Sequence, residues 1–386
     1  MNTSKNMQYL RIHNRGDVIK TLALGRAANR AELALQLNLS KMAIGNIITE
    51  LIESSIVEEY FLESDKASNG RRAKNLRIKP WSIACICVWI SRGNVWTMLM
   101  DITRNTMCEE RFIIPDDCNN NLLIELISRS IEQIIDQNKE MNIIGIGIAS
   151  IGPLDIYNGI ILNPPNFCRI RNLDLMKNLK KKFELPVYMD NDMNCSALAE
   201  LFYGSGRNCR DIVFIGFKHG VGAGVIMNEK ILHGSGGFAG EVGHVSINPR
   251  GMLCACGQRG CIEVYTSEDN ALKNMGVQDI HQLNALLDCG HTPEYILRCL
   301  EEYTEVMQTL TTMLANAYDP EVIIFEKGEE SLQHRYMNEI EEYTNLHMLN
   351  HGYKHIKVID GTLDKPALCG AGYIVFQHIM DGTLQI

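Results

Sequence analysis

The sequence concentrates metal-binding residue types in one stretch, GEVGHVSINPRGMLCACGQRGCIE, from Gly240 to Glu263. One histidine and three cysteines stand there at H-x9-C-x-C-x4-C spacing: His244, Cys254, Cys256 and Cys261. An imidazole and three thiolates suit a closed tetrahedral site, so we expect one structural Zn2+ per chain. A disulfide is a weaker interpretation, because Cys254 and Cys256 are too close in sequence to pair comfortably and three thiols leave one over.

Two carboxylates accompany these ligands, although a metal site closed by four other residues does not need them. Glu241 lies before the histidine, and Glu263 follows the last cysteine. Gly251, Gly257 and Gly260 suit a chain that folds tightly back so that the ligands converge. The carboxylates therefore either support the metal ligands or contact another molecule.

Length and composition indicate a protein of two or three domains with a sizeable core. The chain has 386 residues, of which 46% are hydrophobic. Its most apolar runs, Trp81–Ile90 and Ile143–Ile151, are too short to span a bilayer and are typical of buried strands. The sequence shows no secretory signal, and the ten other cysteines lack regular spacing. We therefore expect reduced thiols, a cytoplasmic location and no membrane partner.

The net charge of -9 is unevenly distributed along the chain. Residues 1–80 contain 13 Lys/Arg and 8 Asp/Glu, whereas residues 81–386 contain 24 and 38. A basic head on an acidic body is typical of a DNA-binding unit joined to another domain, although ordinary surface variation gives such a difference too.

The basic head contains a helix-turn-helix pattern, RAELALQLNLSKMAIGNIITELIE, which begins at Arg30. Its small and apolar residues stand where two crossing helices pack together: Leu33, Ala34, Leu37, Leu39, Ile44 and Ile47. Asn38 occupies the turn position that favours a left-handed backbone, and Ser40 is a suitable N-cap for the second helix. We expect that helix to enter the major groove of double-stranded DNA with the residues at its start: Ser40, Lys41, Met42, Ala43 and Asn46. The alternative is a helix pair that serves only packing.

A predicted wing follows the two helices. Ile56–Leu62 and Asn75–Ile78 are predicted strands around a polar loop, and the loop tip carries Arg71 and Arg72. Arginines on such a loop reach DNA phosphates or a narrow minor groove. The head therefore indicates a winged helix-turn-helix domain over residues 1–80.

The acidic body alternates apolar strands with helical patterns, which predicts an α/β fold. The predicted strands are Ile83–Ile90, Val95–Asp101, Ile143–Ala149, Val187–Asp190, Asp211–Phe217 and Gly222–Met227. The predicted helices include Asn121–Asn138, Leu173–Phe183 and one that ends at Gly204. Asn191 and Asp192 stand at a strand-to-helix edge, where an amide and a carboxylate can bind a polyol.

Several motifs together resemble the ROK (repressor, open reading frame, kinase) family over essentially the whole chain. They are GIGIASIGPLD (Gly145–Asp155), NPPN (Asn163–Asn166), PVYMDNDMNCSALAE (Pro186–Glu200), HGVGAGVI from His219, the cysteine-rich stretch, and DPEVII (Asp319–Ile324). The head is similar to that of the family's sugar-responsive repressors, including the NGRR wing tip. The resemblance implies a two-lobed, actin-like sugar-kinase fold over residues 81–386, with a sugar-binding cleft near residues 190–265.

The resemblance also implies a set of sugar contacts. They are Asn191, Asp192, Glu241, His244, Glu263 and, less securely placed, Gly152. Glu241 and Glu263 would accept hydrogen bonds from sugar hydroxyls, which charged acceptors do strongly. His244 would bind zinc through one nitrogen and face the sugar with the other. The alternative is that both glutamates only support the metal ligands.

The nucleotide side departs from the pattern of the family's kinases. Trp89 replaces the acidic residue expected near magnesium and phosphate, and Lys218 and His219 alter a glycine-rich turn. Glu326 stands where a Gly-Gly pair follows DPEVII. Asp192 matches the kinase base, but losing phosphate and metal contacts costs phosphoryl transfer orders of magnitude in rate.

We therefore expect no enzyme but a sugar-responsive transcription factor that represses genes of sugar metabolism or uptake. Its effector would be a sugar or sugar phosphate, and binding would shift the spacing of two heads in a homodimer or homotetramer on an operator. One alternative is an active sugar kinase that carries a DNA-binding head. Another is a regulator whose effector is a protein.

Overall fold

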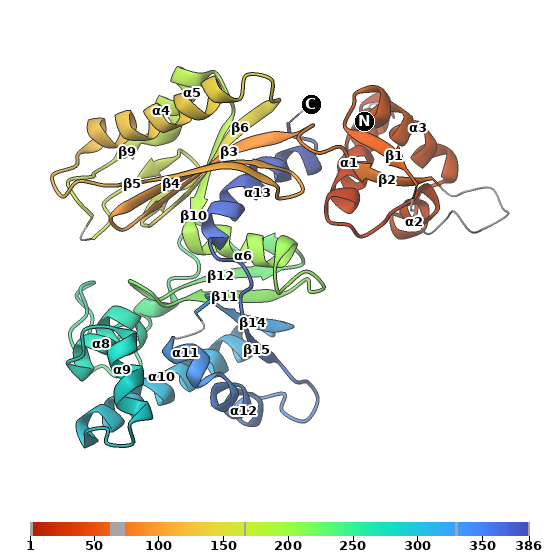
Figure 1. Cartoon of the computed structure of the whole chain (residues 1–386). Helices are drawn as coiled ribbons and strands as arrows, with labels where there is room; N and C mark the ends of the chain where they lie inside the picture. The colour runs from red at the N-terminus through yellow and green to blue at the C-terminus, as the bar shows by residue number, and fades with distance from the viewer. Residues whose placement is uncertain (1–2, 62–73, 166, 329–330, 385–386) are drawn as a thin grey trace. The chain divides into compact units, whose positions relative to one another are not determined.

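The computed structural model describes residues 3–61, 74–165, 167–328 and 331–384, and Figure 1 shows its elements. The chain divides into two compact units. Unit 1 comprises Met1–Ala149, Asp174–Met189 and Ala371–Ile386, and unit 2 comprises Ser150–Leu173 and Asp190–Gly370. The boundary at residue 80 between head and body is a different division, because it falls inside unit 1, and it stays a prediction.

The head contains three helices and a two-stranded antiparallel sheet. These are α1 (Thr3–Ala23), α2 (Arg30–Gln36), α3 (Lys41–Glu53), β1 (Val57–Tyr60) and β2 (Asn75–Ile78). Asn38 has φ of 52°, so the turn between α2 and α3 has the left-handed backbone that the sequence predicts. The side chain of Ser40 caps α3 by accepting a hydrogen bond from the amide of Ala43. Arg71 and Arg72 lie outside the described residues.

The rest of unit 1 is built on a five-stranded sheet in the order β10-β6-β3-β4-β5. Its strands are β3 (Ala84–Ser91), β4 (Asn94–Asp101), β5 (Thr106–Ile113), β6 (Ile143–Ser150) and β10 (Val187–Asn191). The helices α4 (Asn120–Gln137) and α5 (Leu175–Phe183) cover one face, and α13 (Pro366–Met380) lies on the other (Figure 1). The central strand β3 is buried over most of its length, as its continuous apolar run predicts.

The predicted helix over Leu173–Phe183 is wrong at its start. Leu173–Asp174 forms the short strand β9, and α5 begins at Leu175. The reason is local, because the side chain of Asp174 accepts a hydrogen bond from the amide of Lys177 and so acts as the helix N-cap. The other predicted elements agree with the structure to within one or two residues, and the predicted end of the strand Ile56–Leu62 lies outside the described residues.

Unit 2 is built on a second five-stranded sheet, in the order β13-β12-β11-β14-β15. Its strands are β11 (Ile212–Gly216), β12 (Gly222–Met227), β13 (Lys230–Ile231), β14 (Val322–Phe325) and β15 (Lys357–Asp360). β11, β14 and β15 run parallel, and β12 pairs antiparallel with β11. The helix α6 (Asp192–Tyr203) packs on β11 and β12. The carboxyl ends of the three parallel strands therefore share one edge, where α/β proteins usually place ligands.

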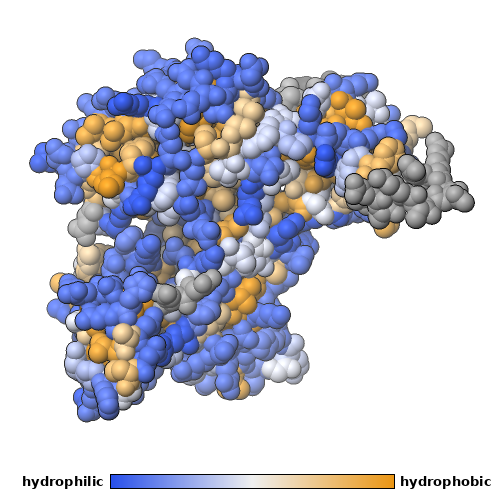
Figure 2. All heavy atoms as spheres, viewed as in Figure 1, coloured by the Kyte–Doolittle hydropathy of each residue, from blue (hydrophilic) through white to orange (hydrophobic). Residues whose placement is uncertain are grey.

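The remaining elements of unit 2 surround this sheet. They are β7 (Leu154–Asp155), β8 (Ile160–Ile161), η2 (Val242–His244), α7 (Glu263–Thr266), α8 (Glu268–Met275), α9 (Ile280–Asp288), α10 (Glu294–Tyr318), α11 (Leu332–Arg335) and α12 (Met337–His347). The long helix α10 packs against α12 and contributes many side chains to the core of the unit. None of the described helices is long and apolar enough to cross a membrane. Polar side chains prevail on the face shown in Figure 2, and apolar side chains form only scattered patches there.

Candidate functional site

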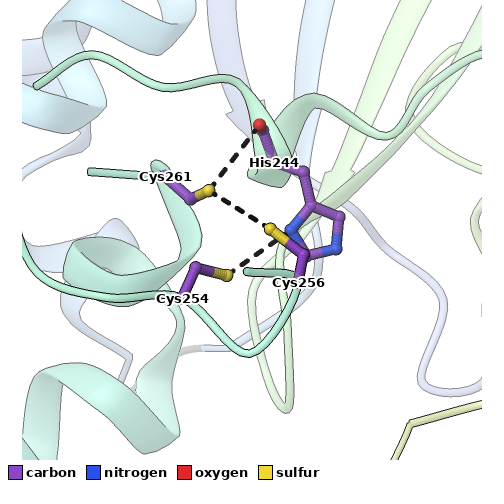
Figure 3. A group of neighbouring side chains, drawn as sticks. All are labelled: His244, Cys254, Cys256 and Cys261. Atoms are coloured by element: carbon purple, nitrogen blue, oxygen red, sulfur yellow. Dashed lines mark hydrogen bonds between the residues drawn. The ribbon is translucent and has the colours of Figure 1, made fainter. Parts of the chain in front are cut away.

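The four predicted metal ligands converge in unit 2 (Figure 3). One ligand atom from each of His244, Cys254, Cys256 and Cys261 lies within 4.8 Å of all the others. The Sγ atom of Cys254 is 3.7 Å from Nδ1 of His244, and the Sγ atoms of Cys256 and Cys261 are 3.6 Å apart. A tetrahedral zinc ion with Zn–S bonds of about 2.3 Å separates two sulfurs by roughly 3.7 Å, so these residues fit the ion. All four positions of such an ion would be filled, which fits a structural role.

Sharp backbone turns make this convergence possible. Gly257 and Gly260 have φ of 92° and 69°, which residues with side chains rarely adopt. A Cβ atom on Gly260 would lie 1.8 Å from the carbonyl oxygen of Asn248, and one on Gly251 would lie 2.2 Å from the hydroxyl of Tyr265. The glycines predicted to let the chain fold back are therefore required by backbone conformation or by close contact. The cysteines are free thiols in the structure.

The predicted polyol-binding pair lies where β10 meets α6. Asn191 ends the strand and caps the helix, because its Oδ1 accepts a hydrogen bond from the amide of Met193 at 2.8 Å. Asp192 is the first residue of the helix and is buried. The strand end and the helix start thus fix an amide and a carboxylate side by side.

Two further predicted residues come close to this pair. A Cβ atom on Gly152 would lie 3.5 Å from Nδ2 of Asn191 and 3.8 Å from Oε1 of Glu241. Glu241 reaches this place because it directly precedes η2, whose Gly243 packs tightly on the residue before β12: a Cβ atom there would lie 2.2 Å from the carbonyl oxygen of Val221. The structure therefore brings the glycine, the amide and one metal-flanking carboxylate together.

The second metal-flanking carboxylate is held by the turn before β12. Glu263 begins α7, and its Oε2 accepts a hydrogen bond from the amide of Val221 at 3.2 Å. The two glutamates are close enough to interact, since Glu263 contributes to raising the pKa of Glu241, although burial is the main cause. His244 directs Nδ1 toward the cysteine thiols, which leaves its other ring nitrogen on the opposite side of the imidazole (Figure 3).

Asp192 has the most perturbed carboxyl group of this site. Burial, followed by the neighbouring Glu326 and with a smaller contribution from Glu241, raises the pKa of Asp192 from 3.8 to about 7. The charged form of this side chain is therefore costly in the free protein. A ligand that donates hydrogen bonds to it would relieve part of that cost.

Asn191 and Asp192 are supported by residues that no sequence pattern singled out. Asp190 is buried and accepts hydrogen bonds from Nδ2 of Asn194 at 2.8 Å and from the amide of Asn191 at 2.7 Å. Nε2 of His233 lies 2.7 Å from its other carboxylate oxygen, and this contact raises the pKa of His233. The i to i+4 spacing of Asp190 and Asn194 offered a signal, but the partner 43 residues further along the chain offered none.

The nucleotide-side positions of the kinase pattern are occupied by the chain's own side chains. Oε2 of Glu326 accepts a hydrogen bond from the amide of Phe217 at 3.3 Å, at the start of the turn that kinases use for phosphate. His219 in this turn pairs with Asp269 at 3.0 Å. In unit 1, the indole of Trp89 stacks on Trp96 with 6.5 Å between ring centroids. The amide of Phe217, directly before this turn, is therefore already engaged within the chain.

The predicted DNA-contacting residues lie at the start of α3, where they differ in exposure. Lys41, Met42 and Asn46 are exposed, whereas Ala43 is only half-exposed. The hydroxyl of Ser40 accepts a hydrogen bond from the amide of Ala43, so its first role is to cap the helix. Two residues that the sequence pattern did not single out lie on the same face of α3: Thr49, which is exposed, and Gly45, which is half-exposed.

These features define a class of protein before any comparison: two α/β units of the sugar-kinase type, with a zinc-type cluster beside an amide and several carboxylates. Comparison with known proteins then gives the family. Residues 85–378 match the ROK family, and the chain belongs to it.

Three relatives show how far the similarity extends. The chain is 27% identical over 386 residues to the xylose repressor of Caldicellulosiruptor bescii, covering 94% of this chain and 95% of that protein. The crystal structure of a ROK family transcriptional regulator, a homolog of the Escherichia coli MLC protein, superposes with a TM-score of 0.82 at 22% identity over 97% of this chain and 98% of the other. The crystal structure of the ROK hexokinase of Thermus thermophilus superposes with a TM-score of 0.68 at 21% identity, over 77% of this chain and 99% of the hexokinase. The two solved structures show the shared fold.

Proposed function

We propose that this protein is a DNA-binding transcriptional regulator, a repressor, whose effector is a sugar or sugar phosphate. The observation that carries the proposal is the extent of the similarity. The hexokinase is matched almost entirely, yet it covers only 77% of this chain, whereas the repressor and regulator cover nearly all of it. Because the family match begins at residue 85, the residues that distinguish this chain from a kinase are those of the head.

The effector site we propose consists of the groups that converge in unit 2: Asn191, Asp192, Glu241, Glu263, His244 and Gly152. Support for it comes from their placement, because an amide, three carboxylates and a ring nitrogen match the hydroxyls of a sugar, which both donate and accept hydrogen bonds. Zinc bound to His244, Cys254, Cys256 and Cys261 would fix the position of Glu241 and Glu263 on either side. The cluster's fit to the ion supports this structural role.

We further propose that the protein does not phosphorylate its sugar. The half-buried carboxylate of Glu326 accepts a hydrogen bond from the amide of Phe217, and a phosphate arriving there would meet like charge. An active kinase with a DNA-binding head is the second candidate. It is favoured by Asp192, whose pKa of about 7 suits a general base at neutral pH.

Two measurements test these proposals. A thermal-shift screen of hexoses, pentoses, amino sugars and their 6-phosphates should identify a stabilising ligand. That ligand should change the affinity of the protein for a duplex selected from random DNA, in keeping with a homodimer or larger assembly on a roughly palindromic site. With ATP, magnesium and the same sugar, a coupled assay should show no turnover above background. Turnover of about one per second would refute the proposal of a regulator without kinase activity and support the active kinase instead.

A further inference from the structure

Gly45 is a half-exposed glycine inside α3, and no contact within the described chain requires a glycine at this position. It is the fifth of 13 residues in the helix, and a Cβ atom built on it would meet no heavy atom within 4 Å. The glycines of α13 contrast with it, because a Cβ on Gly370 would lie 1.9 Å from the carbonyl oxygen of Cys195. A glycine in a helix interior is less stable than alanine, since it loses more backbone freedom on folding. The residue thus weakens α3 without serving the packing of the described chain.

The glycine lies in the middle of a stripe that faces away from the head's core. Four buried side chains fix the inner face of α3: Ile44, Ile47, Ile48 and Leu51. Met42, Gly45, Asn46 and Thr49 are spaced at i, i+3, i+4 and i+7, which places them together on the opposite face. Met42 is 77% exposed, and Figure 1 shows α3 at the surface of the head. We call these four residues the reading stripe.

The chemistry of the reading stripe favours A·T base pairs. It contains no guanidinium, the usual reader of guanine, and the only lysine of α3, Lys41, begins the helix at the rim of the stripe. Asn46 has the amide that pairs with the N6 and N7 atoms of adenine, and Met42 offers an apolar tip for a thymine methyl group. The hydroxyl of Thr49 donates to the carbonyl oxygen of Gly45 at 2.9 Å, which leaves its methyl group for apolar contact.

We infer that Gly45 lets α3 approach the base edges of the major groove closely, and that Asn46 and Met42 then read A·T pairs in each half-site. The partner is double-stranded DNA, so the inference rests on the proposed function. A helix with side chains fills the major groove, and a residue without a side chain at the centre of its outer face brings the neighbouring side chains nearer to the bases. The protein would retain the less stable residue because any larger one would hold the helix away.

The first test separates stability from DNA binding, because the two should change in opposite directions. Gly45→Ala should raise the melting temperature of the protein and weaken its affinity at least tenfold for the best duplex that the wild type selects from a random library. Gly45→Leu should weaken it further. Loss of folding cannot explain a weaker affinity in a more stable protein. If Gly45→Ala binds that duplex as tightly as the wild type does, the inference is wrong.

The second test identifies the base that is read. Selection from the same library with Asn46→Ala should lose the adenine preference at one position in each half-site, and affinity for the wild-type duplex should fall about ten- to a hundredfold. Asn121→Ala is the matched control, since it removes an exposed helical asparagine in α4, outside the head, and should change neither. If Asn46→Ala selects the same sequences as the wild type, the inference is wrong but the proposed function stands. A wild-type protein that enriches no duplex would overturn the proposed function as well.

Discussion

Replacing Asp192 by asparagine should stabilise the free protein while it impairs the response to sugar. The two side chains have the same shape, and asparagine keeps the Oδ1 atom that accepts a hydrogen bond from the amide of Met193 at 3.0 Å. The new amide group would donate to the neighbouring carboxylates instead of repelling them. The substitution therefore removes one buried charge and little else.

The size of the effect follows from the pKa of Asp192. Its rise from 3.8 to about 7 means that the folded state holds a proton that the unfolded state releases. The cost of Asp192 to the free energy of unfolding is absent below its pKa in the unfolded state. It grows as the pH rises toward 7 and is constant above that pH. One pKa unit is worth about 1.4 kcal/mol, so Asp192→Asn should be more stable than the wild type by about 2 kcal/mol at pH 5.5 and about 4 kcal/mol at pH 8.

Urea unfolding of both proteins at several pH values, with zinc present, measures this difference. Asp116→Asn is a suitable control, because it makes the same substitution at an exposed aspartate. The same Asp192→Asn protein should bind the sugar found by screening about tenfold or more weakly, the cost of a charge-assisted hydrogen bond. If Asp192→Asn is less stable than the wild type at pH 8, the ionised carboxylate of Asp192 stabilises the folded protein, and the prediction is wrong.

Three other predictions concern metal, DNA and pH. Purified protein should carry about one zinc per chain, and Cys256→Ser should lose it together with sugar binding; elemental analysis that finds no metal in fresh protein would contradict this. Arg71→Ala and Arg72→Ala should each reduce the slope of log affinity for DNA against log salt concentration by about one if each removes a phosphate contact. An unchanged slope in both variants would show that the wing arginines do not contact DNA phosphates. His233→Gln should destabilise most below pH 6.5, because the hydrogen bond that Nε2 of His233 donates to Asp190 raises the pKa of His233. That stabilisation is complete below the unfolded pKa and is lost as the pH rises through the folded one, and urea unfolding from pH 5.5 to 8 would show it.

Local signals made the head and the metal cluster predictable from the sequence. A left-handed turn needs a tolerant residue, and Asn38 stands at the position where the structure has φ of 52°. The cluster was predictable for the same reason, since its four ligands lie within 18 residues and its glycines mark the turns that bring them together. The start of α5 was less certain because it depends on a single side chain, the cap that Asp174 provides.

Long-range contacts limited what the sequence could say about the candidate site. Asp190 carries no sign that His233 will lie 2.7 Å from it, and Glu326 carries none that it will interact with Asp192, 134 positions earlier in the chain. Gly45 was missed for a different reason. In the sequence, a glycine inside a helix indicates only a position of low helix stability. The structure shows open space around Gly45, which distinguishes it from a glycine required for packing.

Glu326 connects the two halves of the proposed function, because one side chain affects both the sugar side and the nucleotide side. Its carboxylate engages the amide of Phe217, and its charge helps to raise the pKa of Asp192. A base with a pKa near 7 is well suited to take a proton from a sugar hydroxyl, so the base alone does not distinguish a kinase from a sensor. The proposed absence of a phosphoryl-donor site does distinguish them, since a donor needs amides and a metal near the place where this chain has the carboxylate of Glu326. The charge of Glu326 also makes an ionised Asp192 more costly, and a sugar that donates a hydrogen bond to Asp192 would gain affinity from the relief of that cost.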